Sequence, residues 1–311
     1  MNRGGTSYLL VVNPVAGRGG GRSRAGALEE ALAASARVEI METRGRGDAT
    51  EIAALHGPGH HRVIAVGGDG TLNEVLTGLW SLGRPAVDLP ELGFLPAGTA
   101  NAAAPAFGLR TDPVAVARSL ASTGAIDGAA SKPVDFGVVR SETGERPFLL
   151  WCGAGYDAVV IDALNSSRTG RMGLLGLLRN APTVAAHIAR YDEAPVRPVV
   201  DGDRWSDSGG VIVANVADIA FGGTIAEAAD AFDGRLDVVA APTGLKLRVP
   251  FLGLSMLGSG LQNAPGIRWQ AASVVELSSD GSVPVQIDGE PAGHLPVEVR
   301  VVPRGIRLLL T

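Results

Sequence analysis

The sequence predicts an α/β domain followed by a β-rich domain, and three observations support this fold class. Up to residue 121, strand-like apolar runs alternate with helical spacings, a pattern typical of a parallel sheet covered by helices on both faces. After residue 130, short strand-like runs follow one another, and many are separated by Asp-Gly pairs that favour tight turns. The chain of 311 residues is also long enough for two ordinary domains.

The first domain is expected to form around a parallel sheet. Strands are predicted at residues 8–12, 38–42, 63–66 and 91–95, and helices at residues 24–34, 49–55, 72–80 and 113–121. Ligands of such sheets bind beyond the carboxyl ends of the strands. Polar or glycine-rich segments follow three of these strand ends, at residues 13–22, 67–71 and 96–101. We therefore expect the three segments to lie together and to form a binding site.

The second domain is expected to consist mainly of strands. Strand-like runs lie at residues 134–139, 148–152, 196–200, 210–216, 236–240, 274–277, 283–287 and 297–302, with helical breaks near residues 171–190 and 245–262. A last run, at residues 306–310, could return to the first domain. The predicted domains are therefore residues 1–130 together with 303–311, and residues 131–302.

Composition limits the classes of function. Hydrophobic residues make up 46% of the chain, charged residues make up 19%, and the net charge is −5. This balance allows a sizeable core, and an acidic chain argues against nucleic-acid binding, which needs a basic face. Cys152 is the only cysteine, which excludes an intrachain disulfide and favours a reducing cytosol. With no signal peptide and no apolar run long enough to span a bilayer, we expect a cytoplasmic protein.

The most informative segment is Gly67-Gly68-Asp69-Gly70-Thr71, between a predicted strand and a predicted helix. Glycines there leave backbone N–H groups accessible at the positive end of a helix, which suits a phosphate group. Thr71 is expected to cap the helix, with Glu74 completing a capping box. A carboxylate beside a phosphate needs a cation or a hydroxyl group nearby, so Asp69 indicates phosphoryl transfer. The alternative is a tight turn with a solvated Asp69.

Other polar residues near the strand ends are candidates for the same site. Arg18 and Arg22 could bind phosphate oxygens in a bidentate manner, and surface solvation is the alternative. Thr99 and Asn101 could offer a hydroxyl and an amide group to a nucleotide or a lipid headgroup, and ordinary turn chemistry is the alternative.

Glu290 closes a predicted strand through the turn Asp288-Gly289. Transfer of a γ-phosphoryl group to an alcohol needs a carboxylate that accepts the hydroxyl proton, and Mg²⁺ to neutralise the phosphates. Asp69 and Glu290 are the two candidates for this base. As a hairpin turn alone, however, the Asp-Gly-Glu sequence would need no function.

Two other nucleotide-binding patterns are disfavoured. The chain contains no GxxxxGK[ST] motif, so it is not an ordinary P-loop enzyme. Residues 153–158 fit the permissive GxGxxA pattern, but no acidic residue lies about twenty positions further on to hold a ribose. Close packing at a domain junction is the favoured interpretation of these glycines.

Several motifs, in this order, resemble the diacylglycerol kinase catalytic domain family, which also includes sphingosine kinases, ceramide kinases and soluble bacterial lipid kinases. They are NPVAGRG at residues 13–19, GGDGTLNEV at 67–75 and LGFLPAGTAN at 92–101. Two later segments, FGGTIAEAADAFDGRLDVV at residues 221–239 and VQIDGE at 285–290, resemble the C-terminal half of the same family. The resemblance covers roughly residues 8–310. The GGDGT motif alone is shared with NAD kinases and, loosely, with phosphofructokinases.

The resemblance implies an N-terminal three-layer α/β nucleotide-binding domain, a C-terminal β-sandwich, and ATP with Mg²⁺ in the cleft between them. It also implies a set of residues in or beside the nucleotide site. They are Asn13, Gly17, Arg18, Gly67, Gly68, Asp69, Gly70, Thr71, Glu74, Thr99 and Asn101. Glu290 matches the base proposed in bacterial members, and Asp69 matches the base proposed in some others. Asp135, Asp233 and Asp237 match acidic positions tied to a structural Mg²⁺.

One position departs from the family pattern. Members with diacylglycerol activity usually read GTxND, and here Asn101 is followed by Ala102. Sphingosine kinases resemble this chain more closely at that point, which favours a sphingoid or otherwise altered lipid. Residues 168–179 and 249–261 are largely apolar and could dip into a membrane leaflet, although packing of ordinary helices explains them equally well.

We predict a Mg²⁺-dependent, ATP-dependent lipid kinase of the cytoplasm that associates peripherally with membranes and phosphorylates a diacylglycerol- or sphingosine-like lipid. Its expected partner is a lipid substrate at the membrane surface and not a nucleic acid, and the oligomeric state is left open, a homodimer included. One alternative is a soluble small-molecule kinase of the NAD-kinase type. Another is a catalytically silent relative that binds a lipid or a nucleotide.

Overall fold

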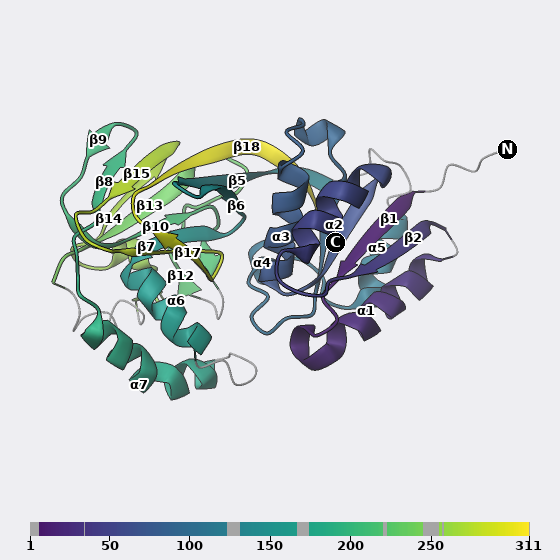
Figure 1. Ribbon diagram of the computed structural model, residues 1–311, viewed down its shortest axis with the longest axis horizontal. Coiled ribbons are helices and arrows are strands. Elements are labelled where there is room, and N and C mark those ends of the chain that lie inside the picture. The colour runs from purple at the N-terminus through teal and green to yellow at the C-terminus, as the bar shows by residue number, and fades with distance from the viewer. Residues whose placement is uncertain are drawn as a thin grey trace. The chain divides into compact units, whose positions relative to one another are not determined.

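The computed structural model describes residues 6–310, except residues 34, 123–130, 167–173, 220–222, 245–254 and 257. The chain divides into two compact units (Figure 1). The first unit contains residues 1–134 and 304–311, and the second contains residues 135–303. The two boundaries fall within strands β5 (Ser131–Ser141) and β18 (Val297–Leu309). The sequence placed them at residues 130 and 303.

The first unit is built on a parallel sheet with the strand order β2-β1-β3-β4. The strands are β1 (Ser7–Val12), β2 (Arg37–Glu42), β3 (Arg62–Gly67) and β4 (Glu91–Pro96). The end of β18 lies parallel to β4, where Leu308 pairs with Leu92. All residues of β1, β3 and β4 are buried, as expected for a parallel sheet that is covered on both faces.

Helices cover this sheet on both sides, so the unit has the three layers that the sequence predicts (Figure 1). They are α1 (Ala16–Leu32), α2 (Asp48–His56), α3 (Asp69–Trp80), α4 (Ala103–Ala106) and α5 (Pro113–Ser122), with short 3₁₀ turns at Gly57–Gly59 and Ala86–Asp88. Helices α1 and α5 share a buried core with alternate residues of β1, among them Tyr8 and Leu10. Helices α2 and α3 pack against each other, α2 contacts β1, and α3 contacts β3 and β4.

The second unit is a β-sandwich, as the family resemblance implies. One sheet has the order β14-β13-β10-β7-β16-β17, and the other contains β5, β6, β8, β9, β15 and the first part of β18. Side chains from both sheets, such as Phe148, Val211 and Val275, form one buried core. The bounds not yet given are β6 (Gly144–Phe148), β7 (Trp151–Gly155), β8 (Arg197–Val200), β9 (Asp203–Arg204), β10 (Ser208–Ala214), β13 (Leu236–Pro242), β14 (Arg268–Ala272), β15 (Val274–Ser278), β16 (Pro284–Ile287) and β17 (Glu290–His294).

Smaller elements complete the second unit. Helices α6 (Tyr156–Ser166) and α7 (Leu174–Arg190) contact each other, and α6 also contacts β7, β10, β16 and β17. Strands β11 (Asp218–Ile219) and β12 (Gly223–Thr224) form a small hairpin, and a 3₁₀ turn covers Leu261–Asn263. Helix α6 therefore lies next to the hairpin β16–β17, which carries Glu290.

Several predicted elements have other limits in the structure; for example, the predicted strands 297–302 and 306–310 are the single strand β18. Helix α1 begins at Ala16 rather than near residue 24, so most of the predicted glycine-rich loop 13–22 is helical. Glycine has a low helix propensity, which is why the sequence favours a loop there. The predicted strand 148–152 is two strands instead: β6 ends at Phe148 and β7 begins at Trp151.

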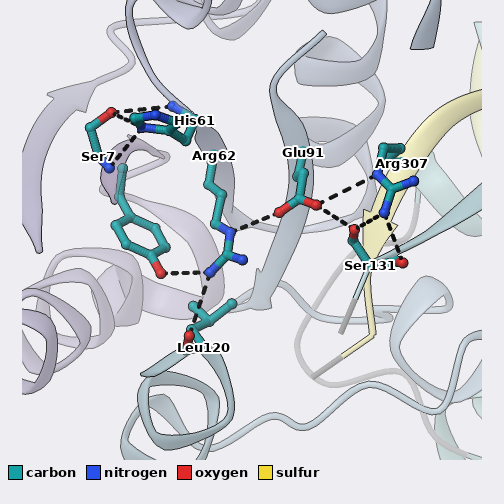
Figure 2. Close-up of polar contacts among 8 residues, drawn as sticks. Ser7, His61, Arg62, Glu91, Leu120, Ser131 and Arg307 are labelled. Atoms are coloured by element: carbon teal, nitrogen blue, oxygen red, sulfur yellow. Dashed lines mark hydrogen bonds and ion pairs between the residues drawn. The ribbon is translucent and has the colours of Figure 1, made fainter. Parts of the chain in front are cut away.

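A buried polar cluster joins the starts of β3 and β4 to β5 and β18, at the end of the sheet opposite the glycine-rich segments (Figure 2). The Arg62 Nε atom lies 2.8 Å from Glu91 Oε2, and Arg62 also donates to the Tyr8 hydroxyl at 2.8 Å. Ser131 donates to the other oxygen of Glu91, and Arg307 Nη2 donates to Ser131 Oγ at 2.7 Å. Glu91 therefore holds the beginning of β5 and the end of β18 on the first unit.

Among the described residues, no helix is both long enough and apolar enough to cross a membrane.

Candidate functional site

The three segments that follow β1, β3 and β4 meet at the carboxyl end of the sheet, which confirms the predicted convergence. The backbone N–H of Asn13 donates to Val66 O at 2.9 Å, and its side-chain amide lies 3.5 Å from Thr71 Oγ1. Ala97 N donates to Gly67 O at 2.6 Å. These hydrogen bonds therefore hold residues 13, 67–71 and 97 together.

Two positions of these segments require glycine because the backbone of another segment lies very close to them. Gly17 has a φ of +53°, and a Cβ atom built on it would lie 2.1 Å from Ala97 O. A Cβ atom on Gly98 would lie 2.5 Å from the Cα atom of Gly68. A side chain at either position would push the three segments apart. Both glycines thus act by allowing the segments to pack together.

The predicted capping box at the start of α3 is wrong. The N-cap is Gly68, which provides no side-chain hydrogen bond, and Thr71 lies inside the first turn. Glu74 caps α2 instead, because its carboxylate accepts hydrogen bonds from Gly47 N at 3.0 Å and Ala49 N at 3.2 Å. The start of α3 therefore has no side-chain cap, a state that suits an anionic ligand.

Asp69 is the first residue of α3, and its carboxylate faces α4. Asp69 Oδ1 accepts a hydrogen bond from Ala103 N at 3.0 Å. Burial raises the pKa of Asp69, and backbone hydrogen bonds from residues 101–103 oppose this increase. Ala102 is buried beside it, with 4% of its surface exposed. These contacts contradict the alternative of a solvated turn aspartate.

The remaining candidates of the first unit differ in their contacts. The Asn101 side chain accepts from Gly98 N at 2.9 Å and donates to Gly98 O at 3.0 Å, so it fixes the loop after β4. Thr99 is exposed at the same loop. The guanidinium of Arg22 lies 2.5 Å from Glu42, which favours the surface interpretation. The side chain of Arg18 lies outside the described part of the structure.

Glu290 lies in the second unit, at the start of β17, where it pairs with Ile287. Asp288 and Gly289 form the turn before it, with φ angles of +47° and +83°. Two positive φ angles are typical of a type I′ hairpin turn, so the predicted Asp-Gly turn is confirmed. Glu290 is partly buried.

The carboxylate of Asp288 anchors this turn to the chain before β7. Its Oδ2 accepts from Leu149 N at 2.9 Å, and its Oδ1 accepts from Leu150 N at 2.9 Å and Trp151 N at 3.1 Å. These three bonds accompany the bend that interrupts the predicted strand 148–152. Sequence analysis treated Asp288 only as a turn residue, because its backbone partners are remote in the chain.

A second set of contacts, which sequence analysis did not anticipate, reaches the same turn from α6. Gln286 Nε2 donates to Asp157 Oδ2 at 2.6 Å, and Gln286 Oε1 accepts from Gly289 N at 2.8 Å. Asn165 Nδ2 donates to Gly289 O at 3.0 Å. The turn before Glu290 is therefore held by side chains from β16 and α6 as well as by Asp288.

The glycines of the GxGxxA pattern serve packing, as the sequence favours. A Cβ atom on Gly153 would lie 1.8 Å from Asp157 Oδ2, and one on Gly155 would lie 2.4 Å from Gly209 O. Gly153 thus leaves room for the Asp157 carboxylate beneath β7. Burial raises the pKa of Asp157 to about 6, although the hydrogen bond from Gln286 opposes this increase.

The three predicted metal ligands of the second unit each interact with an N–H donor. The buried Asp135 accepts from Gly234 N at 2.6 Å, and the buried Asp237 accepts from Trp269 Nε1 at 2.7 Å. The exposed Asp233 accepts from Arg235 N at 2.8 Å. Within the described ranges, no group of three or more His, Cys, Asp or Glu residues could hold a metal ion. The structural Mg²⁺ site that the resemblance implies at Asp135, Asp233 and Asp237 stays a prediction.

Several predictions are left without a structural outcome. Of the two segments that could contact a membrane, residues 168–173, 249–254 and 257 lie outside the described residues. Asp69 and Glu290, the two candidate bases, belong to different units.

Comparisons with known proteins agree on the family. The family model "Diacylglycerol kinase catalytic domain" matches residues 7–135, and the model "YegS C-terminal NAD kinase beta sandwich-like domain" matches residues 151–310. A protein named diacylglycerol kinase from Mycobacterium tuberculosis is 28% identical over 317 aligned residues, which cover 96% of this chain and 93% of that protein. A protein named "Probable lipid kinase YegS-like" from Xanthomonas oryzae pv. oryzae is also 28% identical, over 88% of this chain and 86% of that protein.

Solved structures show the same fold. A crystal structure described as a diacylglycerol kinase from Bacillus anthracis superimposes with a TM-score of 0.74 at 23% identity, covering 100% of this chain and 99% of that chain. The structure agrees with the two family models in the order of the two units and in the convergence of the glycine-rich segments. The chain therefore belongs, in residues 7–135, to the diacylglycerol kinase catalytic domain family and, in residues 151–310, to the YegS C-terminal NAD kinase beta sandwich-like family.

Proposed function

We propose that this protein is a lipid kinase that transfers the γ-phosphoryl group of ATP to the hydroxyl group of a membrane lipid. One observation carries the proposal most directly. Three segments meet around the uncapped start of α3, with the carboxylate of Asp69 beside them. A helix start without a side-chain cap suits phosphate groups. The names of the relatives from Mycobacterium and Xanthomonas support a lipid kinase.

The first unit offers groups that fit MgATP. Gly68 at the N-cap position provides no side-chain hydrogen bond to the first turn of α3, so a phosphate group would not have to displace a side-chain cap there. Asp69 is the only carboxylate in residues 13–22, 67–71 and 96–101. Mg²⁺ usually binds through one or two carboxylates together with substrate phosphates and waters. We therefore assign Asp69 to the cation that enters with ATP.

We assign the role of base to Glu290. A base must accept the proton of the lipid hydroxyl as the phosphoryl group is transferred. Asp69 is a poorer candidate, because Ala103 N–H already donates to its Oδ1 and a cation would engage it further. Glu290 follows a turn that is fixed by Asp288, Gln286 and Asn165, and a fixed base loses little freedom on reaching the transition state.

The acceptor is expected to be an alcohol on a lipid of the diacylglycerol or sphingoid class, presented at a membrane surface with which the protein associates peripherally. Ala102 offers no carboxylate beside Asp69, where diacylglycerol-specific relatives usually have one. This difference supports the sphingoid class. The lipid class is therefore the first variable to test.

The direct experiment is a transfer assay with γ-labelled ATP and Mg²⁺. The acceptors are diacylglycerol, monoacylglycerol, sphingosine and ceramide, each in mixed micelles, with NAD as a soluble acceptor. The proposal predicts label in the organic extract for at least one lipid and none on NAD. Label on NAD alone would indicate an NAD-kinase type of activity. ATP binding without labelled product from any acceptor would indicate a silent relative.

A further inference from the structure

We propose that Asp157 is a positioning residue for the base: it fixes the orientation of the Gln286 amide, and through that amide it fixes the turn that carries Glu290. This inference rests on the proposed function in one respect, namely that Glu290 is the base. All of the residues involved belong to the second unit. Gln286 links them, because one end of its amide donates and the other accepts.

A primary amide has one acceptor end and one donor end. Gln286 Nε2 donates to Asp157 Oδ2 at 2.6 Å, and the opposite end, Oε1, accepts from Gly289 N at 2.8 Å. If the amide were reversed, its NH₂ group would face the N–H of Gly289, and two donors would oppose each other. An ionised carboxylate can only accept hydrogen bonds. Asp157 therefore selects the one orientation that holds Gly289.

Burial of the Gln286 amide disfavours any other orientation. Gln286 has 1% of its surface exposed, so bulk water cannot replace a lost partner, and an unpaired polar group there would be costly. The Asp157 carboxylate packs closely on Gly153, where a Cβ atom would lie only 1.8 Å from its Oδ2. With its pKa raised to about 6 by burial, Asp157 is still mainly ionised above pH 7.

Other contacts hold different atoms of the same turn. Asn165 donates to Gly289 O, and Asp288 accepts from the backbone of residues 149–151. Loss of Asp157 should therefore leave the hairpin in place while releasing the Gly289 N–H. Glu290 is the next residue in the chain, so its Cα position depends directly on this peptide. A small displacement of a reacting group is enough to slow catalysis strongly.

The test compares Asp157→Leu, which removes the acceptor, with Asp157→Asn, which keeps an acceptor oxygen in the same place. Asp162→Leu is the matched control, because Asp162 is an exposed acid on the same helix. We expect Asp157→Leu to lower kcat about 10- to 100-fold with little change in the KM for ATP. Asp157→Asn should recover most of the loss, and Asp162→Leu should behave like the wild type.

A double variant separates positioning from a general structural effect. If Asp157 acts through Glu290, then adding Asp157→Leu to Glu290→Gln should lower kcat no further, because residues that act as a unit are not additive. An equal loss of kcat in both backgrounds would overturn the inference, as would a change confined to the KM for ATP. If Asp157→Leu does not fold, Gln286→Met removes the same two bonds and takes its place.

A readout that needs no activity keeps this inference distinct from the proposed function. Hydrogen exchange at the Gly289 amide, measured by NMR, should be faster in Asp157→Leu than in the wild type and close to wild type in Asp157→Asn. If no lipid is phosphorylated by the wild type, the kinase proposal fails, and the exchange rates alone decide whether Asp157 holds the turn. Unchanged exchange at Gly289 in Asp157→Leu would overturn the inference.

Discussion

The carboxylate of Asp69, at the start of α3, accepts a hydrogen bond from the backbone N–H of Ala103, at the start of α4, at 3.0 Å. This contact joins the glycine-rich segment after β3 to the loop after β4, and it fixes the direction of a carboxylate that burial makes costly to ionise. Backbone hydrogen bonds offset part of this cost, and a bound cation would offset more of it. The contact therefore supports a role for Asp69 in binding MgATP.

Replacing Asp69 by Asn should abolish turnover while leaving the fold intact. The Asn oxygen can still accept from Ala103 N–H, and the cost of burying a charge disappears, so the thermal midpoint should be equal or higher. The loss of cation binding should lower kcat by about 10²-fold or more. Steady-state kinetics and thermal unfolding check both expectations. The control is Asp88→Asn, at an exposed site of the same unit; near-normal activity of Asp69→Asn would remove Asp69 from this role.

Replacing Glu290 by Gln should lower the rate of transfer far more than it weakens ATP binding. The amide cannot accept the hydroxyl proton, so the expected loss of kcat is about 10²- to 10⁴-fold, with the KM for ATP nearly unchanged. Glu276→Gln, at an exposed position on β15, is the matched control. A rise in the KM for ATP with an unchanged kcat would instead assign Glu290 to nucleotide binding.

Removing Glu91 should destabilise the first unit strongly. Arg62 has 3% of its surface exposed, and Glu91→Leu would leave its charge buried without the carboxylate. Breaking a buried ion pair in this way costs about 3–5 kcal/mol in free energy of unfolding. The double variant Arg62→Met/Glu91→Leu removes both charges and should lose less. Urea denaturation measures the difference, and a single variant as stable as the double variant would contradict this account of the cluster.

The stability of the protein should depend on pH through Asp157. Its pKa is about 6 in the folded chain against an ordinary value of 3.8, so the folded state binds the proton more tightly than the unfolded state does. The free energy of unfolding should therefore rise as the pH falls from 7 towards 4, by at most about 3 kcal/mol. The buried Cys152 thiol does not add to this pH dependence, because burial raises its pKa and keeps the thiol neutral.

The variant Asp157→Asn isolates this contribution. It cannot titrate, so the difference in free energy of unfolding between wild type and variant should shift in favour of the wild type as the pH is lowered from 7 to 4. Denaturation curves at several pH values provide the measurement. A difference that stays constant across this range would show that Asp157 titrates normally in the folded protein.

The convergence of the first unit's segments could be predicted from sequence, because it depends only on the order of strands and on the rule that parallel strands end at one edge. Asp69 and Thr71 were identified in this way. The residues at which helices and strands begin and end are harder to predict from sequence. Helix α1 includes a run of glycines that local propensity assigns to a loop, and its first turns are held by packing such as that of Gly17 against Ala97.

Long-range side-chain contacts could not be predicted. The local pattern predicts that Glu74 is half of a capping box, yet its partners are Gly47 and Ala49 at the start of another helix, α2. Asp157 and Gln286 are far apart in the sequence, and nothing in either local pattern indicates their contact. The donors to Asp135 and Asp237, which are Gly234 N and Trp269 Nε1, lie far along the chain from each carboxylate or across a strand pair, and no local pattern indicates them.

The central claim is that this chain transfers a phosphoryl group from ATP to a lipid alcohol. The most direct measurement is the label recovered in the organic extract after incubation of γ-labelled MgATP with mixed micelles of the best acceptor, for the wild type and for Glu290→Gln side by side. The account predicts that the wild type forms a labelled lipid phosphate and that Glu290→Gln forms at least about 10²-fold less of it. Label released only as inorganic phosphate, or equal lipid labelling by both proteins, would contradict it.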